Sequence, residues 1–165
     1  MALRNIVTVD KYGDFLAKKC RPVEKFDKRL AMLLDDMAET LHKANGVGLA
    51  AIQVGILRRA VVIDTGDGNG VRELVNPVIT EESGEQQSME GCLSIPGKWG
   101  ITKRPSHVKV RAQDRHGKTF EYEADGLLAV ASCHEIDHLD GILFLKHATH
   151  MLTPEELKKM ESSEE

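Results

Sequence analysis

The feature that most strongly limits how this chain can fold is one segment with helical spacing, which has apolar residues in its first half and ionisable residues in its second. The segment LLAVASCHEIDHLDG covers residues 127–141, and its apolar run Leu127–Ala131 indicates burial. It contains the pattern His-Glu-x-x-His at His134, Glu135 and His138. Buried imidazoles and carboxylates need partners, and residues i and i+4 of a helix share one face. The segment therefore predicts a buried helix that presents two imidazoles to one metal ion.

Glu135 has a different position from the two histidines. It lies about 100° round the helix from its neighbour His134, which is poorly suited to binding the same ion. It is near enough to reach a water on that ion, and this is where a general base belongs. A chance arrangement on a solvated helix face is the alternative, and the apolar start of the segment argues against it.

Two histidines leave a catalytic metal site one protein ligand short, because such sites usually have three and keep one position open. An extended HExxHxxGxxH motif needs a histidine where this chain has Phe144. Glu155 and Glu156 fall in the first turn of a separate helix and are poor candidates. Cys92 remains, in the segment SMEGCLSIPG, where glycines and Pro96 can hold one side chain in place. The sequence thus favours a Cys/His/His site.

The other cysteines and histidines are expected to have no part in this site. Three cysteines are an odd and sparse set, which argues against a disulfide framework and for a reducing compartment. Cys133 is expected to be a small packed residue, and Cys20 has no metal-binding neighbours. The remaining histidines show no ligand pattern and are expected at the surface or in packing. They are His42, His107, His116, His147 and His150.

The length and charge of the chain are typical of a cytosolic enzyme. Its 165 residues are expected to form a single domain over residues 1–165. The formal net charge of −4, with no basic stripe, gives no reason to expect a nucleic-acid site. No apolar run reaches the roughly 20 residues that a membrane helix needs, and the N-terminus shows no signal or transit pattern.

Hydrophobic periodicity predicts further helices and strands around the buried helix. One helix is expected within residues 23–45, with Asp27 as its N-cap. Another is expected from Thr153 on, where TPEE forms a capping box, and the end of the chain is expected to fray. Four strands are expected, at residues 58–64, 72–80, 107–114 and 118–125. The sequence predicts an α+β fold, with antiparallel sheets wrapped around a central helix that carries HEIDH.

Three segments resemble, in order and spacing, the three motifs of the peptide deformylase family. They are GVGLAAIQVG at residues 46–55, EGCLSIPG at 90–97 and HEIDHLDG at 134–141. One such match alone is weak to moderate evidence, but three in register on a chain of this length are specific. The likeness extends between them and covers the chain up to about residue 150. It implies a hydrolase that removes the formyl group from the N-terminal formyl-methionine of nascent proteins and releases formate.

The resemblance implies the ligands of the metal and the general base. Cys92, His134 and His138 match the residues that bind the metal in the family. Glu135 matches the general acid/base, which acts as a metal-bound water attacks the formyl carbon. Members of the family use ferrous iron in the cell, so one Fe²⁺ is expected here, with Zn²⁺, Ni²⁺ or Co²⁺ able to replace it in preparations.

The resemblance also implies roles for residues that bind the substrate. Gln53 and the backbone N–H of Leu93 match the groups that stabilise the oxyanion, and Gly48 matches a residue whose backbone engages the substrate. Three further positions match those that line the pocket for the methionine side chain. They are Val47, Leu127 and Val130.

Formylated nascent peptides are the partners that the resemblance implies, and the bacterial cytoplasm is the expected location. An organelle and a contact with the ribosome near its exit tunnel are left open by the sequence. Two other classes of protein remain as alternatives. A general zinc metallopeptidase would cleave unformylated peptides, whereas a protein with a structural metal would need four protein ligands and would not depend on Glu135.

Three positions depart from the pattern of the family. Cys133 stands where the family usually has glutamine, and Asp14-Phe15-Leu16-Ala17 where Asp-Pro-x-Leu-Arg is frequent. Trp99, at the expected rim of the pocket, stands where other members have a different residue, sometimes arginine. All the residues that carry the chemistry are kept. An active enzyme is therefore expected, with an altered preference for substrate residues beyond the methionine.

Overall fold

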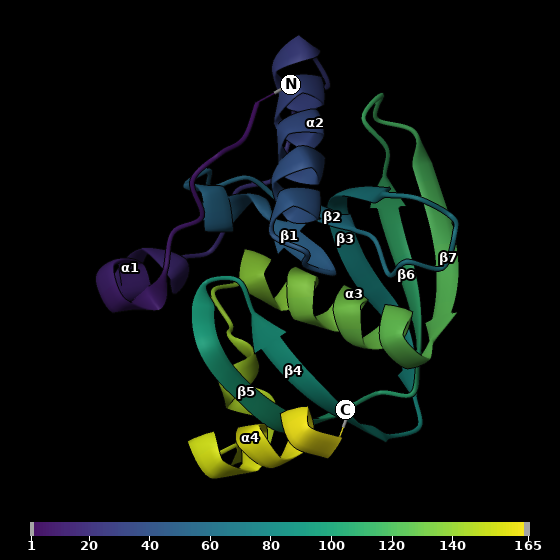
Figure 1. The fold of residues 1–165 in the computed structure, drawn as a ribbon. Helices are drawn as coiled ribbons and strands as arrows, with labels where there is room; N and C mark the ends of the chain where they lie inside the picture. Colours follow the sequence, from purple (N-terminus) through teal and green to yellow (C-terminus); the bar gives the residue numbers. More distant parts are fainter. Residues whose placement is uncertain (1, 164–165) are drawn as a thin grey trace.

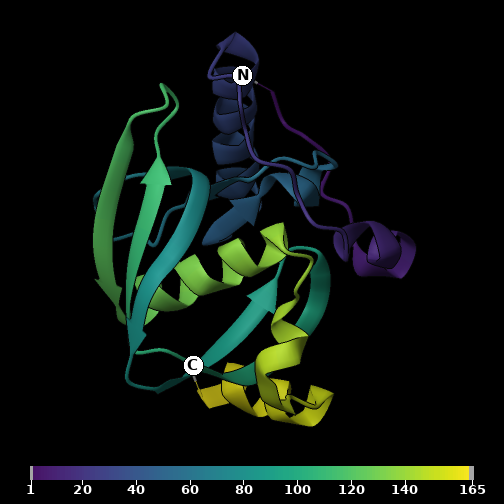
Figure 2. The ribbon, with the colours of Figure 1, turned by 180° about the vertical axis from the view of Figure 1, so that it is seen from behind.

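Two antiparallel sheets pack around one long helix in the computed structural model, which describes residues 2–163 (Figure 1). This helix, α3 (Gly126–Leu139), is the segment predicted to carry HEIDH. It lies between a five-stranded and a three-stranded sheet, as the view from behind also shows (Figure 2). The predicted α+β architecture is confirmed.

The larger sheet contains all four predicted strands and one short strand that the sequence did not reveal. Its order is β1-β2-β3-β6-β7, with every neighbouring pair antiparallel. The strand predicted over residues 72–80 continues to Ser83. The strands are β1 (Gly48–Ala50), β2 (Ala60–Ile63), β3 (Arg72–Ser83), β6 (His107–Gln113) and β7 (Thr119–Asp125).

The smaller sheet was not predicted from the sequence. It has the order β4-β5-β8, again antiparallel. The buried positions of its long middle strand include Gly100, Thr102 and Arg104, which are small or polar, so the usual alternation of apolar and polar residues is missing. The strands are β4 (Gln86–Cys92), β5 (Ile95–Arg104) and β8 (Ala148–Met151).

The predicted helix caps are present. The Asp27 carboxylate accepts a hydrogen bond of 3.1 Å from the Leu30 N–H and so caps α2 (Lys28–Lys43), which begins directly after the predicted cap. Thr153 and Glu156 each accept from the backbone N–H of the other at 3.1 Å, ahead of α4 (Pro154–Ser163). Part of the expected frayed end, residues 164–165, lies outside the described residues.

Three shorter elements complete the described chain. The sequence predicted none of them. They are helix α1 (Val9–Leu16) and the 3₁₀ turns η1 (Ala51–Val54) and η2 (Phe144–His147). Among the described residues, no helix is both long and apolar enough to cross a membrane.

The core has two parts because both faces of the larger sheet are covered. In β2, Val61 and Ile63 belong to the cluster packed on α3, whereas Ala60 and Val62 belong to the cluster packed on α2. Every residue of β2 is buried, as expected for a strand between two helices. Full burial of a side chain the size of valine or leucine contributes about 1.5–3 kcal/mol. The sheet thereby fixes the position of α3, and with it the histidine pair.

We expect Asp27→Ala to lower the free energy of unfolding by about 1 kcal/mol, because the Leu30 N–H at the start of α2 loses its acceptor. Urea unfolding followed by circular dichroism measures the change. Asp27→Asn is the matched control, since asparagine caps helices nearly as well as aspartate. Equal losses in both variants would contradict a role for Asp27 as a cap.

Candidate metal centre

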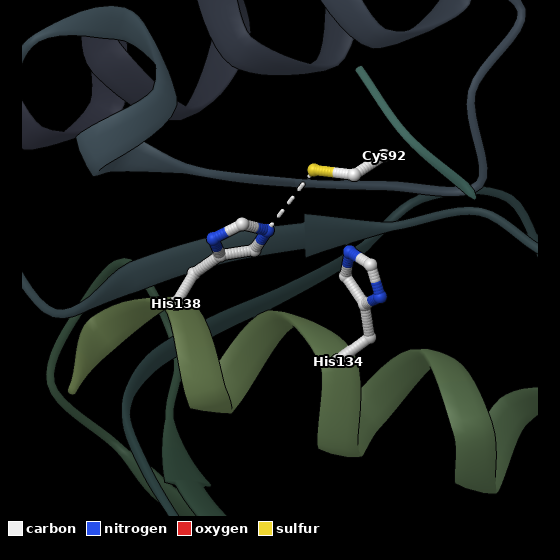
Figure 3. Close-up of side chains that lie close together, drawn as sticks. All are labelled: Cys92, His134 and His138. Carbon is white, nitrogen blue, oxygen red and sulfur yellow. Dashed lines mark hydrogen bonds between the residues drawn. The ribbon is translucent and has the colours of Figure 1, made fainter. Parts of the chain in front are cut away.

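The Cys92, His134 and His138 side chains meet between the smaller sheet and α3. Their ligand atoms all lie within 4.8 Å of one another, and Cys92 Sγ is 3.4 Å from His138 Nε2. Figure 3 shows both imidazoles projecting from one face of α3 towards the sulfur. No other group of three histidine, cysteine or acidic side chains is arranged in this way within residues 2–163. A thiolate and two imidazoles are donors that suit zinc, ferrous iron and related divalent ions.

The end of β4 places the sulfur opposite α3. The register of β4 and β5 shifts between Gly91 and Cys92, so that Cys92 pairs with Ile95 across a tight turn. A Cβ atom on Gly91 would lie only 2.7 Å from the ring of Trp99. A larger residue here would have to displace the indole, which occupies the space beside the strand just before the cysteine.

A buried carboxylate fixes the orientation of His134. Glu90 Oε1 accepts a hydrogen bond of 2.7 Å from His134 Nδ1, which directs Nε2 towards Cys92 and His138. The Arg104 guanidinium donates to Glu90 at 2.7 and 2.9 Å, and the Thr102 hydroxyl donates to it as well. Burial raises the pKa of Glu90, but the bonds from His134 and Arg104 outweigh it and hold the pKa at about 2. Glu90 is therefore ionised at neutral pH.

Glu90 and Arg104 were not among the residues that the sequence analysis selected. Glu90 gave a weak signal, as a charge two positions before Cys92 in a segment of small residues. Arg104 gave none, because its burial follows from a strand that the sequence pattern does not reveal.

The pKa values of the two imidazoles are shifted in opposite directions. Burial lowers the pKa of His138 well below its ordinary value, and the charges of His134 and Arg104 lower it further. Burial acts in the same direction on His134, but the Glu135 carboxylate and the contacts with Cys92 and Glu90 raise its pKa to about 10. Because a metal binds neutral imidazole, an ion at this centre competes with the proton on His134.

Glu135 is a buried carboxylate with one oxygen unused. Its Oε1 has no hydrogen-bond partner among the described residues, and its Oε2 lies 3.9 Å from His134 Nε2. Burial raises the pKa of Glu135 to about 7, which suits a group that takes up and releases protons near neutrality. A Cβ atom on Gly48 would lie 2.5 Å from Glu135 Oε2, so the glycine gives this carboxylate its space.

The Gln53 side chain is held with its N–H₂ group facing the sulfur. Gln53 Oε1 accepts a hydrogen bond of 2.9 Å from the Ala50 N–H, which leaves Nε2 on the side of Cys92. Nε2 donates to Ser94 Oγ at 3.1 Å and to Cys92 Sγ at 3.5 Å. The side chain is buried, so its position is fixed before anything binds.

A cavity of about 380 Å³ opens beside the three ligands, within the size range of small-ligand sites. All the residues selected from the sequence line it except His138, which is buried. The structure brings these residues together, and their chemical roles remain predictions. The selected residues that line it are Val47, Gly48, Gln53, Cys92, Leu93, Leu127, Val130, His134 and Glu135.

Comparison with known proteins gives one consistent result. A profile of the family described as "Polypeptide deformylase" matches residues 3–153. The peptide deformylase of Caldicellulosiruptor bescii is 54% identical over 162 residues, which are 98% of this chain and 95% of the relative. The crystal structure of a peptide deformylase from Legionella pneumophila is 40% identical, with a TM-score of 0.83, and the match covers 98% of this chain and 97% of the other. The crystal structure of the peptide deformylase from Thermotoga maritima is 36% identical, with a TM-score of 0.84, and the match covers 89% of this chain and 98% of the other.

We expect Glu90→Gln to change how stability depends on pH. The pKa of Glu90 is about 2 in the folded protein and 4.5 ordinarily, so its ionised form stabilises the fold above pH 4.5. This contribution is lost as the pH falls from 4.5 towards 2. The variant should be less stable than the wild type at pH 7 and should lose less stability over that acidic range.

Urea unfolding at pH 7, 4.5 and 3 measures both effects. Glu85→Gln is the control, because Glu85 is an exposed acid with an ion pair of 3.8 Å to Lys103. Parallel pH dependences for the wild type and Glu90→Gln would contradict the predicted role of the buried carboxylate.

Proposed function

The chain belongs to the polypeptide deformylase family, and we propose that it carries out the reaction of that family with a divalent metal ion held by Cys92, His134 and His138. The protein is thus a hydrolase of protein biosynthesis that removes the N-terminal formyl group from nascent peptides. The observation that carries the proposal for the metal is the meeting of the three ligand atoms beside the cavity, which Cys92 and His134 line.

The donor set supports one metal ion with an open position. Three protein ligands lie together among the described residues, whereas a closed structural site would need four. A divalent ion held by these residues would supply a Lewis acid that activates water. We propose Fe²⁺ as the ion used in the cell, with Zn²⁺, Ni²⁺ or Co²⁺ replacing it in preparations. Availability decides among them, since intrinsic affinity favours zinc over iron.

Glu135 is the proposed general acid/base. Its unused Oε1 accepts a proton from the attacking water and later delivers it to the departing amine. Two features support this role: the carboxylate lines the cavity beside His134, and its pKa of about 7 allows transfer in both directions. Gly48 supports it further, because any larger residue would displace the carboxylate.

The proposed oxyanion site consists of Gln53 and Leu93. The Gln53 amide is fixed by Ala50 and directed towards Cys92, so it can donate to an oxygen that develops negative charge beside the sulfur. Leu93 follows Cys92 in the chain and lines the same cavity, which supports its backbone N–H as the second donor. Removing one such donor from an enzyme typically costs about 2.7–4 kcal/mol of transition-state stabilisation.

The apolar wall of the cavity is the proposed pocket for the methionine side chain. Val130 is buried, whereas Val47 and Leu127 are partly exposed at the opening, so the wall extends from inside to the surface. We propose that the backbone of Gly48 in β1 binds the peptide as it enters. The bacterial cytoplasm, where formylated chains are made, is the proposed location, and a ribosome contact stays a prediction of the family resemblance.

We expect the protein, reconstituted with Fe²⁺ without oxygen, to release formate from formyl-Met-Ala. Glu135→Ala should lower the rate by at least about a hundredfold, because general acid–base catalysis typically contributes 10²–10⁴-fold. The metal content of the variant is the control, since Glu135 is not a proposed ligand. Formate release that survives in Glu135→Ala would contradict its role as the base. Cleavage of unformylated peptides would favour a general metallopeptidase.

We expect Trp99 to set a preference for the residue after methionine. Trp99 is 40% exposed and lines the cavity together with the exposed Met89, so this part of the rim should favour apolar over acidic residues. Trp99→Arg should shift the ratio of kcat/KM values towards acidic second residues by up to about fivefold, since an exposed ion pair contributes at most about 1 kcal/mol. Formyl-Met peptides with acidic and apolar second residues measure this. Identical ratios in both proteins would contradict it.

A further inference from the structure

A continuous line of hydrogen bonds and ion pairs runs from His134 to the protein surface. Beyond Glu90, the Arg104 guanidinium also donates through Nη1 to Asp137 Oδ2 at 3.0 Å. His147 Nε2 lies 3.1 Å from that same oxygen. The side chain of Arg104 is 3% exposed, that of Asp137 23% and that of His147 36%, so the line begins in the core and ends at the surface.

The η2 turn that carries His147 also contacts His134 directly. Phe144, the first residue of the turn, is buried and stacks on the His134 ring, with centroids 6.0 Å apart and an interplanar angle of 20°. A Cβ atom on Gly100 of β5 would lie 3.3 Å from the Phe144 ring, so the turn fits closely against the smaller sheet. Because the packing of Phe144 fixes the turn, it also holds the His147 imidazole next to the Asp137 carboxylate.

The Asp137 carboxylate is more exposed to solvent than the other two charged groups of the line, Arg104 and Glu90. Arg104 and Glu90 are enclosed by protein, whereas Asp137 borders solvent. Water reaching Oδ2 would screen its attraction for Arg104 and allow the carboxylate to rotate away. His147 covers the same oxygen and so protects the bond that holds one arm of the guanidinium. The other arm binds Glu90, which orients His134. Mutation of a residue that hydrogen-bonds to a metal ligand typically lowers the affinity of the site for the metal by about 10–100-fold. A more distant residue is expected to have a smaller effect.

We propose that His147 is a positioning residue for the metal centre, acting on His134 through Asp137, Arg104 and Glu90. The inference rests on the proposed metal site and deepens it. It assigns a role to a histidine that the sequence pattern placed among surface and packing residues. It also makes η2, a turn outside the substrate cavity, part of the structure that holds the ion.

His150 provides a matched control within the same part of the chain. It lies in β8, three residues beyond His147, and is also partly exposed. Its imidazole pairs with Glu156 at 2.8 Å, at the start of α4, and is not part of the line to His134. Removing it therefore deletes a comparable surface histidine without touching Asp137.

The first experiment titrates the full-length metal-free protein with Co²⁺ and follows the absorption bands of the cobalt–thiolate centre, so the measurement does not require turnover. We expect His147→Ala and His147→Leu to weaken Co²⁺ binding by about threefold to tenfold, scaled down from the effect of direct partners. Leucine keeps the bulk of the side chain and so separates packing from pairing. His147→Arg, which can donate to Asp137, should restore the affinity, and His150→Ala should leave it unchanged.

Three results would overturn the proposal: unchanged affinity in the alanine and leucine variants, no recovery with arginine, or an equal loss in His150→Ala. A wild-type protein that binds no Co²⁺ would overturn the proposed metal site and this inference with it, and is distinct from these results.

A double-mutant cycle tests the route through Asp137. Asp137→Asn should weaken Co²⁺ binding by itself, and adding His147→Ala to it should have little further effect, because the two residues act in series. Fully additive losses would show that His147 acts by another route and would overturn the proposal. The melting temperature of each metal-free variant, measured beside the titration, separates loss of positioning from loss of the fold.

Discussion

The buried contact of Glu90 with His134 and Arg104 is the interaction on which the site depends. It joins β4, β5 and α3, and therefore links the smaller sheet to the helix that carries both histidines. A buried carboxylate is costly unless its charge is compensated. Here an arginine, an imidazole and the Thr102 hydroxyl compensate it. The same contact places Cys92, two residues further along β4, opposite the imidazoles.

The two sheets contribute different parts of the site. The larger sheet packs α3 against β2 and provides Gly48 at its edge, which gives space to Glu135. The smaller sheet provides Cys92 and the charged network. The cavity lies where these two parts meet, so its wall combines residues from distant parts of the chain. The Gln53 amide is held by the Ala50 N–H before anything binds, and such preorganisation fits its proposed role at an oxyanion.

The parts of the fold that follow from local patterns could be predicted from the sequence. The apolar period and the Asp27 cap predict α2, and the hydrophobic pattern of residues 107–114 and 118–125 predicts β6 and β7. The smaller sheet could not be predicted, because Gly100, Thr102 and Arg104 face inward in β5. Their burial depends on partners from other elements, and no local period records it.

The sequence by itself determined the donor set and the helix that presents it. His134, Glu135 and His138 owe their relative positions to helix geometry, which four residues of separation are enough to define. Elimination of the other candidates added Cys92, and the family motifs added Gln53. Only the tertiary structure decided the supporting contacts of Glu90, Arg104, Asp137 and His147, since strand pairing and helix packing bring together residues as far as 44 positions apart. Charges of this kind find partners only after the chain has folded, and a linear pattern cannot show which ones they meet.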